Sequence, residues 1–169
     1  MPMPQAQLPR YPVQVLTTAF HLQSTMETIG PVLDFLNDVG RPHLPFQDAT
    51  VSPLTAGPMG QVSRSQIIVA KTDVVALYID DATGRSSISL LRRVERGIIY
   101  LPGLVCRCEL HMGADTRWQD MLGLMAGDFF GVTAVTAFPL ITLPGPFPQQ
   151  ADMLIVNRRH VRMMHLDQP

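Results

Sequence analysis

The chain matches itself when it is shifted by 86 residues, so that residues 31–81 fall on residues 117–167 without a gap. Eight positions of this overlap are identical, and Asp34 with Asp120 is one such pair. Apolar positions and turn residues agree in the same order. The overlap therefore indicates two tandem copies of one small unit, and both copies are expected to fold in the same way.

The shift is not constant along the chain. Upstream of residue 31 it becomes 90, which pairs His21 with His111. The difference of four residues predicts a longer loop in the first copy, at about residues 23–30, because loops tolerate insertions. The last strand of each copy, at 68–81 and 155–167, stays on the shift of 86.

Each copy contains the same expected elements. These are a first alternating strand (13–22 and 104–112), a short helical segment (30–39 and 116–126), a second strand (46–54 and 132–140), a Pro/Gly-rich turn and the closing strand. The sequence therefore predicts an α+β protein that is predominantly β. It consists of two tandem copies of a half-barrel-like strand–short helix–strand–strand unit.

The size of the copies predicts how they associate. Units of roughly 65–70 residues are near the lower limit for independent stability. Twofold dimers are the commonest oligomers, and gene duplication can fuse such a dimer into one chain. We therefore expect an intrachain pseudo-twofold dimer. Its parts are an extended proline-rich arm at 1–12, the first repeat at 13–81, a basic link with an additional strand at 82–98, and the second repeat at 99–169.

Three short patterns suggest a relationship. They are Leu33-Asp34-Phe35-Leu36-Asn37, Pro45-Phe46-Gln47-Asp48-Ala49 and Val156-Asn157-Arg158-Arg159-His160-Val161. Together they resemble an uncharacterised small bacterial β-rich domain, and as two copies the resemblance covers nearly the whole chain. No activity is known for that family, so the resemblance implies a small β-rich fold and no catalytic residues. The second copy departs from the pattern at 120–124 and 131–135, where a shared site would be lost.

The two cysteines invite a metal hypothesis, because thiolate and imidazole are good zinc ligands. In a strand, Cys106 and Cys108 share one face and His111 points to the other. We therefore interpret the cysteines as small core residues and expect neither a metal site nor a cofactor. Metal binding or redox chemistry is the alternative.

His21 and His111 are expected to be equivalent and to lie on the more polar faces of their strands. About a twofold axis they would meet, or line one pseudo-symmetric groove twice. Such a pair can bind a metal, an anion or a proton near neutral pH. The alternative is an ordinary half-exposed strand histidine in each copy.

Seven basic residues form two clusters that are candidates for binding an anion or a partner. They are Arg92, Arg93 and Arg96 in the link, and Arg158, Arg159, His160 and Arg162 in the last strand. Strand alternation predicts that Arg158, His160 and Arg162 share one face and that Arg159 points to the other. Basic groups on one strand face repel each other unless they meet acids or an anion. Internal ion pairs and a plain solvated face are the alternatives.

The composition favours a binding function over catalysis. Charged residues make up 16% of the chain, against about 25% in an average soluble domain, which predicts apolar surface covered by another subunit or protein. Phosphate-loop, dinucleotide and nucleophile-elbow patterns do not occur in the sequence. We therefore expect no enzyme, but a scaffold, accessory subunit or adaptor. It would bind a protein partner, or form a homo-oligomer, through apolar and Arg-bearing surface.

Two other classes of function stay open. One is a small nucleic-acid-binding β-barrel of the Sm-like or oligonucleotide-binding kind. The net charge of −1 argues against this class. The other is a sensor of a small ligand or metal in the groove between the repeats. The start of the chain is unlike a secretory signal, so a cytoplasmic location is expected. The uncharged stretch 129–151 contains four prolines, which argues against a membrane-spanning helix.

Overall fold

The structure, a computed structural model, describes residues 7–168. The elements of the first half are β1 (Arg10–Thr17), β2 (Phe20–Glu27), α1 (Val32–Asn37), β3 (His43–Pro53), β4 (Val62–Ala70), the 3-10 turn η1 (Lys71–Asp73), β5 (Val74–Ile79) and α2 (Ala82–Ser86). Those of the second half are β6 (Arg93–Leu101), β7 (Leu104–Met112), the 3-10 turn η2 (Trp118–Asp120), α3 (Met121–Leu124), β8 (Phe129–Pro139), β9 (Gln150–Asn157), the 3-10 turn η3 (Arg158–His160) and β10 (Met163–Leu166).

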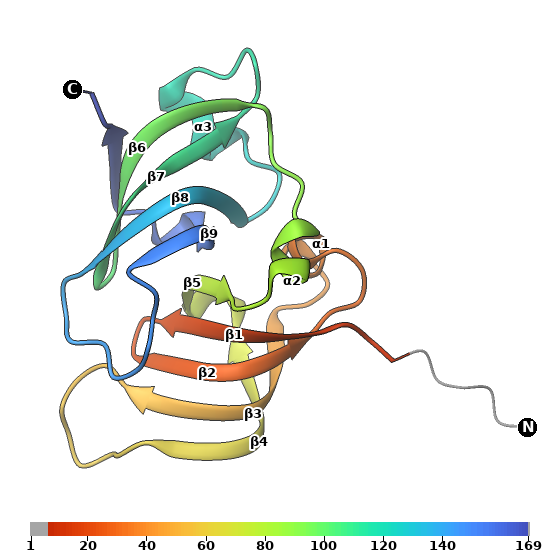
Figure 1. Ribbon diagram of the computed structural model, residues 1–169, viewed down its shortest axis with the longest axis vertical. Coiled ribbons are helices and arrows are strands. Elements are labelled where there is room, and N and C mark those ends of the chain that lie inside the picture. The colour runs from red at the N-terminus through yellow and green to blue at the C-terminus, as the bar shows by residue number, and fades with distance from the viewer. Residues whose placement is uncertain (1–6, 169) are drawn as a thin grey trace, which may run out of the picture.

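All strands of the described part join into one antiparallel sheet, in the order β10-β6-β7-β8-β9-β5-β1-β2-β3-β4. The short helices lie at its margins, with α1 and α2 close to the middle of the molecule (Figure 1). The predicted class, α+β and predominantly β, is confirmed. The second half occupies the upper part of Figure 1 and the first half the lower part.

The two halves have the same internal topology. In each, four strands form a meander, and a fifth strand after a 3-10 turn returns beside the first, as β5 pairs with β1 and β10 pairs with β6. Asp48 in β3 and Ala134 in β8, 86 positions apart, both have φ of 49°. Each accompanies a register shift against the preceding strand. Such a backbone conformation is uncommon outside glycine, so its recurrence supports the repeat seen in the sequence.

The prediction of one first strand at 13–22 is wrong, because these residues belong to two strands, β1 and β2, that form a hairpin. Its two-residue turn, Thr18 and Ala19, lies between strands that both contain apolar residues. By their partners in the sheet, β1 and β2 correspond to β6 and β7 with a shift of 84, so that Leu16 corresponds to Tyr100. The predicted shift of 90 is therefore also wrong.

The expected link at 82–98 is divided between two elements. Its beginning forms α2, where Asp81 accepts the N–H of Gly84 at 2.8 Å, and its end forms part of β6. The strand expected at 86–91 does not form. The arm expected at 1–12 overlaps β1, since Arg10 pairs with Glu27 at its start, and residues 1–6 lie outside the described residues.

The closing strand at 68–81 is also two strands, the end of β4 and all of β5, separated by η1. In this region the halves correspond with a shift of 87. Val74 and Val161 each follow a 3-10 turn, and the N–H groups of Asp80 and Asp167 each donate at 2.9 Å to a carbonyl of the first strand of their half. The shift rises from 86 to 87 because the connection from β8 to β9 is one residue longer than the connection from β3 to β4.

The expected pseudo-twofold arrangement is wrong. The halves join where β5 pairs with β9, with Ala76 opposite Val156 and Leu77 opposite Ile155. These strands stand at different places in their halves, because β9 corresponds to β4 and β5 corresponds to β10. A twofold axis would also pair β4 with β10, but those strands form the two opposite ends of the sheet (Figure 1). The contact is therefore heterologous, since it joins two unlike edges.

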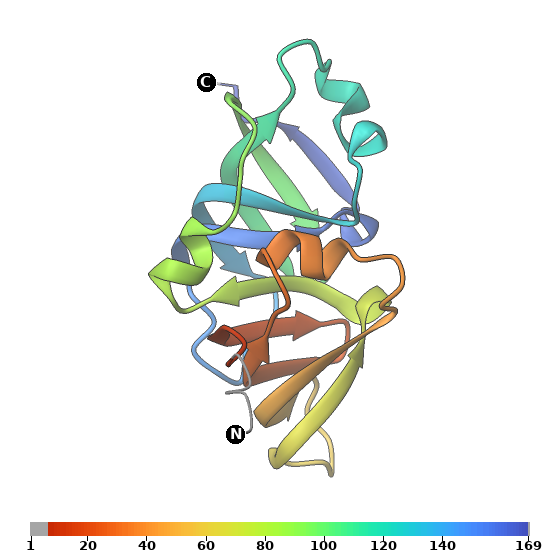
Figure 2. The same ribbon diagram turned by 90° about the vertical axis from the view of Figure 1, so that its right-hand side faces the viewer.

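The apolar core continues across this junction. Leu16, Val75 and Ala76 of the first half pack into the core cluster of the second half. Phe129 and Ile155 of the second half pack into the cluster of the first. Figure 2 shows the sheets of the two halves meeting along β5 and β9. Neither half therefore completes its core alone.

Within residues 7–168 there is no helix with the length and apolar character needed to cross a membrane. The uncharged stretch at 129–151 consists of β8, a proline-rich connection and the first residues of β9. The expectation that it does not form a spanning helix is confirmed.

Candidate functional site

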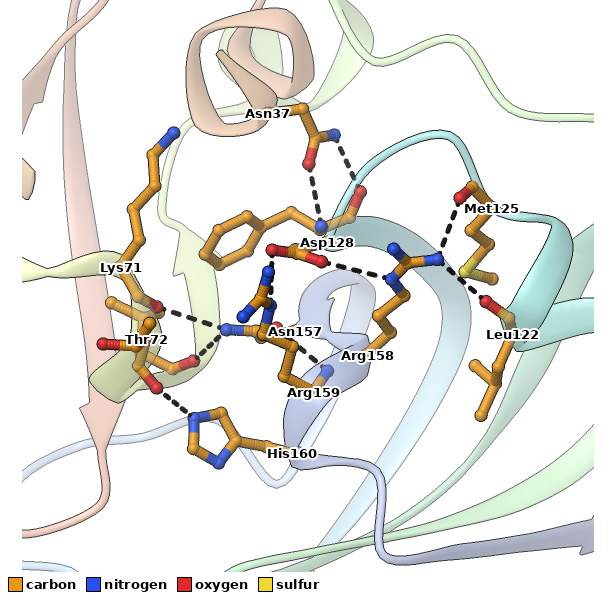
Figure 3. Close-up of polar contacts among 12 residues, drawn as sticks. Asn37, Lys71, Thr72, Leu122, Met125, Asp128, Asn157, Arg158, Arg159 and His160 are labelled. Carbon is orange, nitrogen blue, oxygen red and sulfur yellow. Dashed lines mark hydrogen bonds and ion pairs between the residues drawn. The ribbon is translucent and has the colours of Figure 1, made fainter. Parts of the chain in front are cut away.

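The junction between the halves is held by two asparagine side chains. Asn157, at the end of β9, is 1% exposed, and its amide nitrogen donates to the carbonyl oxygens of Lys71 (3.2 Å) and Val74 (2.9 Å) (Figure 3). Its carbonyl oxygen accepts the N–H of Arg159 at 3.0 Å. The side chain therefore ties η3 of one half to η1 of the other.

Asn37 makes a second tie from the last residue of α1. Its amide nitrogen donates to the carbonyl oxygen of Phe129 at 2.9 Å, and its own oxygen accepts the N–H of Phe129 at 2.8 Å. Both polar backbone groups at the start of β8 are thus satisfied by one side chain. His160 adds a third contact, since its Nε2 donates to the carbonyl oxygen of Thr72 at 2.6 Å (Figure 3). We refer to Asn37, Asn157 and His160 as the junction clamp.

The asparagines of the clamp were not among the residues predicted for the site. They are the only two asparagines of the chain, and both belong to the patterns quoted for the resemblance. The corresponding positions in the other half are Gly123 for Asn37 and Ala70 for Asn157. Asn37 of the first half and Asn157 of the second half both contact the junction. The counterpart of each in the other half has no amide side chain.

The strand alternation predicted for Arg158, Arg159 and His160 is wrong, because these residues form η3. Both arginines turn to Asp128, with Nε of Arg158 at 3.2 Å and Nε of Arg159 at 2.7 Å from its carboxylate. Arg158 also donates to the last carbonyl groups around α3, those of Leu122 and Met125, at 3.0 and 2.9 Å. Helix ends leave such carbonyls without partners, so Arg158 has a structural role.

The other basic candidates lie apart from η3. Arg93 donates to Glu95 and to the carbonyl oxygen of Thr116, at 2.8 and 2.7 Å. Arg96 lines a shallow depression beside Asp167, while Arg92 and Arg162 are exposed. The predicted basic residues therefore do not form one surface.

A groove of about 370 Å³ with several charged lining residues opens beside the clamp. Arg41, Lys71 and Arg159 line it together with the acids Asp38 and Asp128. Burial lowers the pKa of Lys71, and its ammonium already donates to the carbonyl oxygen of Asp38 at 2.6 Å. The ammonium group of Lys71 is thus already engaged within the chain.

The two histidines expected to be equivalent do not correspond. The shift of 84 places His21 at the position of Val105, and His111 at the position of Glu27. His111 bonds the carbonyl oxygen of Leu91 and the Thr133 hydroxyl, at 2.9 and 2.8 Å. The predicted pseudo-symmetric groove therefore does not form.

His21 is buried beneath the connection from β8 to β9. Its ring makes an edge contact with Phe147 at 6.3 Å between centroids, and its Nε2 lies 2.8 Å from Oε1 of Gln14. A Cβ atom at Gly145 would lie 2.5 Å from the ring, so this glycine lets the connection approach closely. Burial lowers the pKa of His21 below its ordinary value of 6.5.

We expect this histidine to weaken the fold in acid. Below pH 6.5 the unfolded chain gains a proton at His21 that the folded chain binds only at lower pH. Its contribution to stability is therefore complete above pH 6.5 and is lost as the pH falls toward the folded pKa. The midpoint of thermal unfolding should fall more between about pH 7.5 and 5.5 for the wild-type chain than for His21→Gln. Parallel curves for the two chains would contradict the assignment.

Both cysteines are buried in the core of the second half, as the alternation predicted. Burial raises the pKa of Cys106 to about 12 and also raises the pKa of Cys108. A thiol that stays protonated is a poor nucleophile and a poor metal ligand. In the described part of the chain, acidic, histidine and cysteine side chains do not gather in threes that could hold a metal ion.

The feature that best fits a binding function is the edge of the sheet formed by β4. This strand is nine residues long and, within the described residues, pairs only with β3. It ends in the aliphatic run Ile67, Ile68 and Val69, and Ile68 is 67% exposed. Its only charged residue is Arg64. Edge strands are normally protected by charge, proline or a covering segment, and β4 has little of this protection.

The opposite edge is formed by β10, which pairs with β6. Its sequence is Met-Met-His-Leu, and Met163 is 54% exposed. Among residues 7–168, two unpaired strand edges with apolar side chains thus lie at the two ends of one sheet (Figure 1).

The chain has no match among family models, curated proteins or solved structures. The resemblance to the small bacterial domain therefore stays a prediction. The function proposed below depends on the geometry of this chain alone.

Proposed function

We propose that this protein is a non-catalytic scaffold or adaptor of the cytoplasm that binds a protein partner along the free edge of β4. The observation that carries the proposal is the uncovered aliphatic end of this strand, with Ile68 67% exposed. A partner strand added there would form main-chain hydrogen bonds for affinity, and alternate side chains would provide specificity.

The roles of the polar residues support a binding protein over an enzyme. Asn157 and His160 hold the junction, Arg158 caps α3, and the Cys106 thiol is buried with a raised pKa. Asn157, Arg158 and the Nε2 atom of His160 are thus engaged in hydrogen bonds within the fold. Nucleic-acid binding receives less support, because Arg158 and Arg159 share the carboxylate of Asp128.

Substitution of Ile68 tests the proposal. A lysine in the middle of a strand contact opposes pairing, so Ile68→Lys should reduce recovery of the partner about tenfold, which corresponds to about 1.4 kcal/mol of binding. The measurement is affinity purification of the tagged chain from its native host, with quantitative mass spectrometry of what is recovered.

Val39→Lys is the matched control, because Val39 is fully exposed in the loop after α1 and belongs to neither edge strand. It should recover the partner as the wild-type chain does. Both variants should unfold at the wild-type temperature. A companion recovered equally well with Ile68→Lys would show that β4 is not the binding edge.

A further inference from the structure

We propose that the partner of β4 is a second copy of this chain, so that copies join head to tail with β10 of one beside β4 of the next. This inference rests on the proposed function, since it names the partner for the same edge. Its basis is that the chain already contains one such contact, the pairing of β5 with β9 at the junction.

The edges that the junction joins correspond to the edges that stay free. By sheet partners, β9 of the second half corresponds to β4 of the first, and β5 of the first half corresponds to β10 of the second. The contact between β5 and β9 therefore has a counterpart between β10 and β4. These strands lie at opposite ends of the sheet, so the counterpart can form only between two chains (Figure 1).

The register of the new contact follows from the correspondence. Ala76 corresponds to Met163, because both lie opposite corresponding residues of the first strand of their half. Val156 corresponds to Val69 in the same way. Since Ala76 pairs with Val156 at the junction, Met163 is expected opposite Val69 of the next chain.

The neighbouring pair is defined by the same step. Leu77 corresponds to Met164, and Ile155 corresponds to Ile68. Because Leu77 pairs with Ile155 at the junction, Met164 is expected opposite Ile68 of the next chain.

Burial at the junction shows what the free edges lack. Ile155 is 1% exposed because it packs into the core cluster of the other half, whereas its counterpart Ile68 is 67% exposed. Ala76 is fully buried, whereas its counterpart Met163 is 54% exposed. Pairing of the free edges would remove both side chains from water, which stabilises association.

The contact between chains differs from the junction in its polar groups. The junction clamp has no counterpart at the free edges, where Gly123, Ala70 and Asp73 stand at the positions of Asn37, Asn157 and His160. Backbone hydrogen bonds and four apolar side chains would hold the chains together. We therefore expect an assembly that dissociates on dilution. A heterologous contact closes into a ring or continues as a filament according to the rotation at each step.

Two charge variants test the head-to-tail arrangement by complementation. Ile68→Lys blocks β4 and Met163→Lys blocks β10, and both positions are exposed, so folding should not change. In sedimentation at increasing concentration, the wild-type chain should exceed the monomer mass of 18.7 kDa, and each variant alone should stay at it. An equimolar mixture should form one-to-one dimers, since β10 of the first variant and β4 of the second are intact. A mixture that stays monomeric overturns the proposal.

Disulfide trapping tests the register. Facing Cα atoms in antiparallel strands lie about 4.5–5.5 Å apart, within the range that a disulfide spans. Ile68→Cys mixed with Met164→Cys should form a mixed dimer, while Ser65→Cys with Met164→Cys, the out-of-register control, should form none. The native cysteines should not interfere, because they are buried. Dimers formed by Ile68→Cys alone would indicate a twofold pairing of β4 with β4 and would overturn the proposal.

The outcomes separate this inference from the proposed function. Monomers at every concentration, together with a different protein whose recovery is lost in Ile68→Lys, would overturn the inference and leave the proposed function standing. If the chain is monomeric and Ile68→Lys reduces the recovery of no protein, both this inference and the proposed function are overturned.

Discussion

Replacement of Asn157 with alanine is expected to lower the free energy of unfolding by about 2–4 kcal/mol. The amide is 1% exposed and contributes two hydrogen bonds to backbone carbonyls of the other half, at 3.2 and 2.9 Å. Alanine would leave those buried acceptors, and the N–H of Arg159, without this partner. An unsatisfied buried polar group costs about 1–3 kcal/mol.

The loss should also change how the chain unfolds. The paired segment of β5 and β9 covers only two facing residue pairs, so the clamp is a large part of the polar contact between the halves. Once it is weakened, we expect the halves to unfold in separate steps, because less free energy then couples the two halves across the junction. The measurement is urea-induced unfolding followed by circular dichroism and by fluorescence of Trp118. Transitions that coincide in the wild-type chain should separate in Asn157→Ala.

Two further variants define the role of the amide. Asn157→Asp keeps the shape and the acceptor for Arg159 but cannot donate to the carbonyls of Lys71 and Val74. It should destabilise the chain at least as much as alanine does. Gln66→Ala removes an exposed amide from β4 and should change stability by less than about 0.5 kcal/mol. If Asn157→Ala costs no more than Gln66→Ala, the clamp is not what holds the junction.

Local patterns in the sequence predict much of each half. The helical segment of the first copy and both second strands appear where they were expected, because apolar spacing and flanking prolines are local signals. The hairpin turn at Thr18 and Ala19 was missed, since neither residue is a strong turn signal. Its counterpart, Pro102 with Gly103, has such a signal, and Gly103 adopts φ of 72°.

The arrangement of the halves could not be predicted, because it depends on which edges meet. The self-match of the sequence predicts a repeated unit, but a repeated unit can join through like edges or unlike edges. The candidate site was affected in the same way. His160 was expected on a strand face, but Asn157 begins the turn η3 by accepting the N–H of Arg159. That turn directs His160 to Thr72 of the other half.

Gly127→Ala is expected to lower the free energy of unfolding by about 2–3 kcal/mol, because the new side chain would displace Asn37. A Cβ atom at Gly127 would lie 2.2 Å from Cγ and 2.3 Å from Oδ1 of Asn37. The amide cannot move aside freely, because it is held between the N–H and the carbonyl oxygen of Phe129. The substitution should therefore break both hydrogen bonds of this part of the clamp.

The mechanism predicts that the effects of Gly127→Ala and Asn37→Ala are not additive. Asn37→Ala alone should cost a similar amount, since it removes the same two hydrogen bonds. In that background the clash is gone, so adding Gly127→Ala should cost less than about 0.5 kcal/mol. The measurement is a double-mutant cycle from urea unfolding. Gly123→Ala is the matched control, because a Cβ atom there would meet no atom within 4 Å. Additive losses of stability would mean that Gly127→Ala acts through the backbone at position 127. The close fit between Gly127 and the Asn37 amide would then not stabilise the junction.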